Sequence, residues 1–114
     1  MDIEILRKIC LSLPGATEDI KWEADLCFLI GGKMFCVTGF EPGSSVTLKV
    51  PDPEFEEMIA GPGFSPAPYL ARAKWVQVED LDQLSKEEWS RLIQQSYELV
   101  KSKLPKKVLK EMGL

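Results

Sequence analysis

The residue types that most often carry enzyme chemistry are sparse in this sequence. It contains three cysteines, Cys10, Cys27 and Cys36, and no histidine. The cysteines form no Cys-x-x-Cys pair, and none stands at an evident helix start beside bases, where a thiolate would be stabilised. The common catalytic triads need a histidine, and a structural zinc site needs four ligands of the usual kinds. We therefore expect a protein that is not an enzyme, with no catalytic residue, no metal site and no cofactor.

Carboxylates gather in two stretches of the chain. The first could offer oxygen ligands to a hard cation, but it follows no calcium-loop pattern, and a solvated acidic surface explains it better. The second falls at the expected start of a helix, where the macrodipole favours negative charge. The two groups are Glu18, Asp19, Glu23 and Asp25, and then Glu54, Glu56 and Glu57.

Positive charge is concentrated late in the chain. The net charge of −4 argues against a partner held by bulk electrostatics, yet residues 58–114 hold 9 bases against 7 acids, whereas residues 1–57 hold 5 against 11. The stretch Lys101–Lys110 has five lysines and no acid. These lysines fit either a solvated helix end or contacts with phosphates. If they converge with other cations in the folded chain, the nucleic-acid-binding residues are Lys33, Lys49, Arg72, Lys74, Lys101, Lys103, Lys106 and Lys107.

The N-terminal half predicts one helix followed by three strands. Asp2 can cap a helix with an apolar stripe from Ile3 to Leu13, which Pro14 and Gly15 end. Residues 16–25 are expected to be a polar connection anchored by Trp22. The apolar runs 26–30 and 33–37 flank Gly31-Gly32, which is typical of a hairpin, and a third strand alternates over 46–50.

A two-residue turn fixes the register of that hairpin. It sets Cys27 opposite Cys36, so that the two thiols lie next to each other. We expect them to be reduced, either as an oxidisable pair or simply as packed thiols. Gly31-Gly32-Lys33 lacks the spacing of a phosphate-binding loop, so the turn explains it better.

The second half predicts two helices and a strand around a proline-rich loop. Asp52-Pro53 is expected to cap and begin a helix that ends near Gly61, and 74–78 is a short strand. Ser85 and Glu88 form a capping box for a long helix, which Pro105 interrupts.

The loop 61–70 has three prolines and two glycines, so neither a helix nor a central strand can cross it. We expect its aromatic residues to fold back onto the core. The loop then either positions the following strand only or presents a protein-binding platform made of Phe64, Tyr69 and Trp75, together with nearby Arg72 and Lys74.

Length and hydropathy favour a single domain over residues 1–114. The chain is long enough for one core, and no apolar run approaches the roughly 18 residues of a membrane span. The acidic N-terminus does not resemble a signal peptide. We expect a cytoplasmic protein with no membrane partner.

Ordered motifs over nearly the whole chain resemble the MmcQ/YjbR family. They are Leu13-Pro14-Gly15-Ala16, Glu18-Asp19, Trp22, Gly32-Lys33-Met34-Phe35, Leu48-Lys49, Pro62-Gly63-Phe64, Pro66-Ala67, Trp75-Val76, Leu92-Ile93, Ser96-Tyr97, Leu99-Val100 and Lys103-Leu104-Pro105. The resemblance implies a compact CyaY-like fold, likened to a double wing, and a DNA-binding function. Members often carry Asn and His shortly before the tryptophan, where this chain has Ala71-Arg72-Ala73-Lys74.

Together these features predict an α+β domain with an antiparallel sheet of at least four strands and helices packed mainly on one side, in the order α-β-β-β-α-β-α. The leading functional hypothesis is a small non-enzymatic module that binds DNA weakly. The alternative is a protein-interaction or regulatory module that uses the proline-rich loop and no nucleic acid. Metal handling by acidic residues is a distant third, by analogy with the frataxin-like fold alone.

Overall fold

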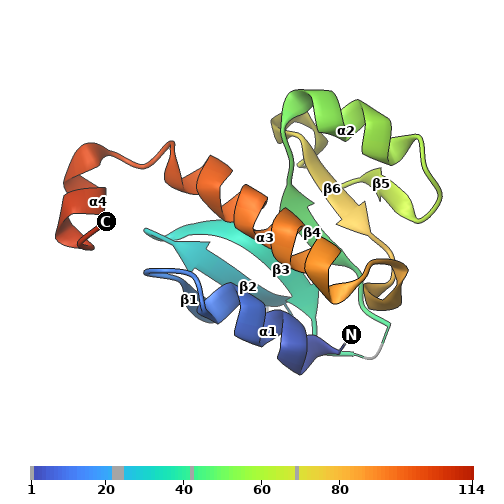
Figure 1. Ribbon diagram of the computed structural model, residues 1–114, viewed down its shortest axis with the longest axis horizontal. Coiled ribbons are helices and arrows are strands. Elements are labelled where there is room, and N and C mark those ends of the chain that lie inside the picture. Colours follow the sequence, from blue (N-terminus) through green and yellow to red (C-terminus); the bar gives the residue numbers. More distant parts are fainter. Residues whose placement is uncertain (1, 22–24, 42, 69) are drawn as a thin grey trace.

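The computed structural model describes residues 2–21, 25–41, 43–68 and 70–114. Figure 1 shows helices packed beside a curved sheet, with a short last helix at the C-terminus. In chain order the elements are α1 (Ile3–Leu11), β1 (Thr17–Lys21), β2 (Asp25–Ile30), β3 (Lys33–Gly39), β4 (Val46–Lys49), α2 (Asp52–Ile59), β5 (Phe64–Pro66), the 3₁₀ turn η1 (Ala71–Ala73), β6 (Trp75–Val78), the 3₁₀ turn η2 (Leu81–Gln83), α3 (Lys86–Lys101) and α4 (Lys106–Glu111).

Within the described residues, six strands form one sheet in the order β1-β2-β3-β4-β6-β5, and every neighbouring pair is antiparallel. Alternate residues of β2, Leu26, Phe28 and Ile30, join the main core with residues of α1, α2 and α3. Since strand side chains alternate between faces, the three helices cover one face of the sheet. The α+β architecture confirms the predicted fold class, with more strands than the minimum expected.

The sequence signals at the helix ends are largely confirmed. The Asp2 carboxylate accepts a hydrogen bond from the Ile5 N–H at 2.9 Å, and Ser85 and Glu88 form the predicted capping box at the start of α3. The prediction for α2 is wrong in one detail: the capping position is Pro51, and no side chain caps the helix. Asp52 instead lies in the first turn, where its charge complements the macrodipole.

The predicted polar connection over residues 16–25 is wrong, because β1 occupies Thr17–Lys21 and pairs with β2. This strand lies at the edge of the sheet, and three of its five residues are exposed. An exposed edge strand needs no alternating apolar residues, so its sequence resembles a loop. The proposed anchor Trp22 falls outside the described residues.

The predicted pairing of Cys27 with Cys36 is also wrong. The turn pairs Ile30 with Lys33 and Leu29 with Met34 as expected, but a bulge then sets Phe28 opposite Cys36, and Cys27 opposite Val37. The extra residue in β3 is Phe35, and the bulge lets both Phe35 and Cys36 face the helix-side core.

The thiol that Cys36 meets belongs to α1. A hydrogen bond between the Cys10 and Cys36 thiols, followed by burial, raises the pKa of Cys10 far above its usual value. Both side chains are completely buried, and neither forms a disulfide. The pair joins α1 to the sheet as packed thiols.

The proline-rich segment is more ordered than a plain loop. Phe64–Pro66 form β5 at the second edge of the sheet, where the missing N–H of proline costs least. Phe64 packs against the core, as expected for an aromatic residue of this loop. Tyr69 lies outside the described residues.

Candidate functional site

The predicted basic residues come from four separate segments of the chain. Lys33 begins β3 at the hairpin tip, Lys49 ends β4, Arg72 and Lys74 belong to η1 and the residue after it, and the remaining lysines span the end of α3 and the start of α4. Five of the eight side chains are exposed: Lys33, Arg72, Lys103, Lys106 and Lys107.

The hairpin tip lies against the junction of α3 and α4. Gly31 makes this approach possible, because a Cβ atom there would lie 2.7 Å from a methyl group of Leu104 and 3.2 Å from one of Val108. Figure 1 shows the tip and α4 at the same end of the molecule. Lys33 therefore lies at the same end as the lysines that begin α4.

Lys49 connects η1 to the end of α3. Its ammonium group donates a hydrogen bond to the carbonyl oxygen of Ala73, and its backbone N–H donates to the Ser96 hydroxyl at 2.9 Å. The pKa of Lys49 is lowered, first by burial and then by the positive charge of Lys103, against a smaller raising effect of Asp52. Lys49 and Lys103 are thus close enough to repel each other, although they are 54 positions apart along the chain.

Two of the predicted basic residues already have aromatic partners. The ammonium nitrogen of Lys74 lies 5.0 Å from the ring centre of Phe55, and that of Lys101 lies 5.7 Å from the ring centre of Tyr97. At these distances each cation is attracted to the ring face. Both lysines are half-buried, so they are less available to a ligand than the five exposed cations.

None of the eight cations has a carboxylate within 4 Å among the described residues, where the ion pairs are formed by Arg7 and Arg91. The acids on the neighbouring turns, Glu98 and Glu111, are exposed. The structure therefore places Lys33 near the lysines that follow α3, whereas Arg72 and Lys74 lie on the side of α2, and within the described residues none of these cations is neutralised by a direct ion pair.

The residues proposed for protein binding through the proline-rich loop are less accessible than the exposed cations. Trp75 is only 6% exposed, and Phe64 is half-buried against the core. The loop does cover a hollow of about 570 Å³ that sequence reasoning missed. Its lining comes from strands β2, β3 and β4 as well as the loop: Asp25, Met34, Val37, Thr47, Ala67, Pro68 and Leu70.

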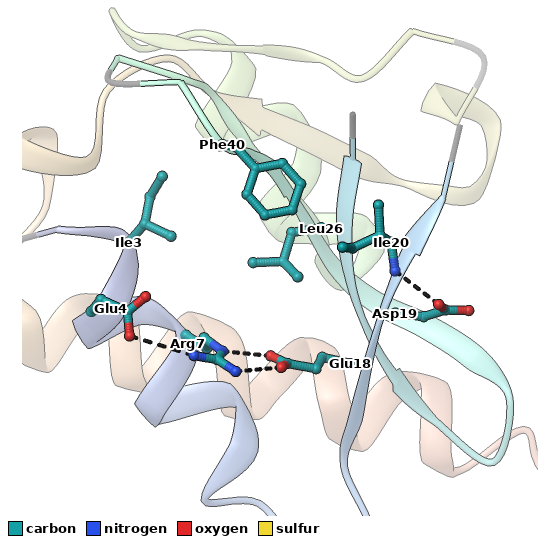
Figure 2. Close-up of a pocket in the computed structure, with 8 residues that line it drawn as sticks. All are labelled: Ile3, Glu4, Arg7, Glu18, Asp19, Ile20, Leu26 and Phe40. Atoms are coloured by element: carbon teal, nitrogen blue, oxygen red, sulfur yellow. Dashed lines mark hydrogen bonds and ion pairs between the residues drawn. The ribbon is translucent and has the colours of Figure 1, made fainter. Parts of the chain in front are cut away.

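A second hollow that the sequence did not indicate lies between α1 and β1, with a volume of about 490 Å³. Figure 2 shows Ile3, Ile20, Leu26 and Phe40 around it and the Arg7–Glu18 pair along one side. The Arg7 guanidinium donates two hydrogen bonds to Glu18, at 2.6 and 2.5 Å. The available sequence signal was Ile20, a large apolar residue within an otherwise charged stretch.

Within the part of the chain that the structure describes, no group of three or more His, Cys, Asp or Glu side chains could hold a metal ion. Glu18, one of the acids considered as a ligand, is paired with Arg7 instead. No described helix is both long and apolar enough to cross a membrane.

Comparisons with known proteins agree with this architecture. The YjbR family model matches residues 11–99. A crystal structure of the Deinococcus radiodurans protein DR2400, with the domain DUF419, is 29% identical and superimposes with a TM-score of 0.86, over 98% of this chain and 88% of that one. A Pseudomonas syringae protein is 20% identical, with a TM-score of 0.72 over 87% of this chain and 98% of that one, and so shares the fold. No curated protein matches the sequence. The chain belongs to the YjbR family.

Proposed function

We propose that this YjbR-family domain is a small non-enzymatic module that binds DNA weakly through the basic end of the molecule. The observation that carries the proposal is the packing of the hairpin tip against Leu104 and Val108, which brings Lys33 near the exposed lysines between α3 and α4. The positive charge of Lys103 also lowers the pKa of Lys49. Like charges held together favour an anionic ligand, because the ligand relieves their repulsion. Phosphate groups of a nucleic-acid backbone supply such anions in a row.

The distribution of charge over the molecule supports weak binding of DNA. The exposed cations lie on the hairpin tip, η1 and the start of α4, so a ligand must contact several segments at once. The whole chain nevertheless carries a net charge of −4, which repels a polyanion from the remaining surface. We expect affinity that is measurable at low salt and falls steeply as salt rises.

The non-enzymatic part of the proposal rests on the nucleophiles. The sequence has no histidine, and all three thiols are buried. A buried thiol whose pKa is raised, such as Cys10, supplies little thiolate at neutral pH. The alternative of a protein-binding proline loop has less support, because its proposed contact residue Trp75 is buried.

Fluorescence anisotropy with a labelled DNA duplex tests the proposal. Lys103→Ala removes one exposed cation beside Lys49 and is expected to weaken binding roughly tenfold at about 50 mM salt, the value for one lost phosphate contact. Lys86→Ala is the matched control, since Lys86 is exposed at the opposite end of α3. Equal affinities of the two variants, or no binding by the unaltered protein, would refute the proposal.

A further inference from the structure

The two most exposed large apolar side chains of the described residues lie on the same hollow. Ile20 is 58% exposed and Phe40 is 48% exposed, and both line the space of about 490 Å³ between α1 and β1. Ile3 and Leu26 complete its apolar wall (Figure 2). An apolar surface grouped in a concave site is typical of a docking surface, whereas single exposed apolar residues are ordinary.

A second hollow adjoins this one and shares part of its lining. The neighbouring space, of about 480 Å³, shares Ile3, Glu4 and Phe40 with the first. It extends to η2 and adds Leu81 to the apolar lining. Phe40 therefore lines both hollows, which together we call the Phe40 groove.

The rim of the Phe40 groove is strongly acidic. Among the described residues that line it, the cation is Arg7, whose guanidinium is bound to Glu18 and lies 3.5 Å from Glu4. The hydrogen bonds and charge of Glu18 raise the pKa of Arg7 well above its usual value, so its charge is matched within the protein. The carboxylates that line the two hollows are Asp2, Glu4, Glu18, Asp19, Asp80 and Asp82.

The adjacent sheet edge is not set up for addition of another strand. β1 is an edge strand, but the Ile20 N–H already donates to its neighbour's carboxylate, Asp19 Oδ1, at 2.8 Å. A partner strand that used this N–H would have to displace that bond. Recognition by side chains that enter the groove is therefore favoured over backbone pairing.

We propose that the Phe40 groove is a docking site for a basic, amphipathic segment of a partner protein. Aliphatic side chains of that segment would pack against Ile20 and Phe40, while its lysines or arginines would face the acidic rim. Charge complementarity selects this occupant, because the same rim repels nucleic acid and anionic lipid. The groove reaches η2, which leads into the N-terminal end of α3, whereas the predicted DNA surface surrounds the C-terminal end, about 24 Å away along a 16-residue helix (Figure 1). The two surfaces are therefore separable by mutation.

An NMR titration of the labelled full chain with designed peptides tests the proposal. The probe is a short helical peptide with leucines on one face and lysines beside them. Its controls replace the leucines by serine or the lysines by glutamate. The leucine–lysine peptide is expected to shift the amide signals of Ile3, Ile20 and Phe40, and both control peptides are expected to bind at least tenfold more weakly. No shift at these residues, or equal binding of the serine peptide, would overturn the proposal.

Matched variants of the protein locate the binding. Ile20→Ser/Phe40→Ser is expected to lose roughly tenfold or more in affinity for the leucine–lysine peptide. Leu11→Ser/Leu114→Ser removes two other exposed apolar side chains, 37% and 39% exposed, and is expected to bind normally. All four residues are exposed, so the spectra of the free variants should show an intact fold. Equal loss in both variants would contradict the site, and self-association abolished by Ile20→Ser/Phe40→Ser would assign the groove to a second copy of the chain.

Discussion

Ser96 is completely buried on α3 and connects the helix to two strands. Its hydroxyl donates to the Phe35 carbonyl at 2.6 Å and accepts from the Lys49 N–H at 2.9 Å. The first bond is made beside the bulge in β3, and the second fixes the backbone of Lys49, one of the proposed DNA-binding lysines. The Ser96 side chain thus positions α3 against the sheet at two points, the bulge of β3 and the backbone of Lys49.

Ser96→Ala is expected to destabilise the protein by about 1–3 kcal/mol, because it leaves a half-buried N–H and a buried carbonyl without their partner. Urea unfolding followed by circular dichroism measures the change. Ser102→Ala is the control: its hydroxyl donates to the Leu99 carbonyl at the exposed end of the same helix. We expect it to change stability by no more than about 0.5 kcal/mol. Similar losses in both variants would contradict this role of Ser96.

The Arg7–Glu18 pair predicts a pH dependence of stability. Hydrogen bonds from Arg7 lower the pKa of Glu18 in the folded chain, against a smaller opposing effect of burial. The unfolded carboxyl has a pKa near 4.3, roughly the model-peptide value. The stabilisation is therefore fully present above that pH and is lost as the pH falls through the lower folded value.

Glu18→Gln should consequently be less stable than the unaltered protein at neutral pH, and the difference should shrink in acid. Thermal unfolding at a series of pH values measures it. Glu57→Gln is a suitable comparison, since Glu57 is an exposed acid of α2. A stability difference for Glu18→Gln that stays constant down to strongly acid pH would show that its charge is not involved.

In the β2–β3 hairpin, the sequence predicted the turn but not the bulge. The turn at Gly31-Gly32 was predictable because glycine pairs of this kind favour tight hairpins. The bulge at Phe35 was not, because both arms are apolar on both faces and one register suits them as well as another. The misplaced Cys27–Cys36 pair follows directly from that ambiguity.

The β2–β3 hairpin packs against the segment that contains α4, and each stabilises the other. Gly31 and Gly32 both have positive φ, 58° and 81°, so alanine at either position has a similar backbone cost. They differ in their surroundings: a Cβ at Gly31 would clash with Leu104, whereas one at Gly32 meets nothing within 4 Å. The pair of positions therefore isolates the contact between the hairpin and α4.

Gly31→Ala is expected to be at least about 1 kcal/mol more destabilising than Gly32→Ala, the lower end of the cost of overpacking. Urea unfolding gives the difference. Hydrogen exchange should show faster exchange of the α4 amides in Gly31→Ala only. Equal unfolding free energies of the two variants would mean that the hairpin tip does not depend on α4.

Elements with strong local signals were predictable, and the edges of the sheet were not. The capping box of α3 lies within four consecutive residues, Ser85–Glu88, so the local sequence is enough to predict it. By contrast, β1 has a single apolar residue, Ile20, and its remaining side chains are polar or charged. Pairing with β2 holds this strand in place, and such pairing between distant segments leaves little trace in the local sequence.

The surroundings of the two ends of α3 differ in charge. Acidic residues of α1 and η2 line the groove near its N-terminal end, where Lys86 is also exposed, and the exposed Lys103, Lys106 and Lys107 follow its C-terminal end. Both charge signs also suit the helix macrodipole, which alone would favour this arrangement. The macrodipole does not explain why Lys49 lies close to Lys103, because Lys49 belongs to a strand and not to the helix. The sequence identifies the cations but does not show that Lys49 and Lys103 lie close together, because their distance depends on the order of the strands in the sheet.

The salt dependence of DNA binding tests the proposed convergence most directly. For a duplex, the logarithm of the binding constant falls with the logarithm of salt concentration by roughly 0.9 for each neutralised phosphate. The unaltered chain is expected to give a clear negative slope, and Lys106→Ala/Lys107→Ala should reduce its magnitude by about 2. Lys86→Ala/Arg91→Ala, which removes two cations from the first half of α3, should leave it unchanged. A slope that is the same in both double variants, or no binding even at about 50 mM salt, would contradict DNA binding through the basic end.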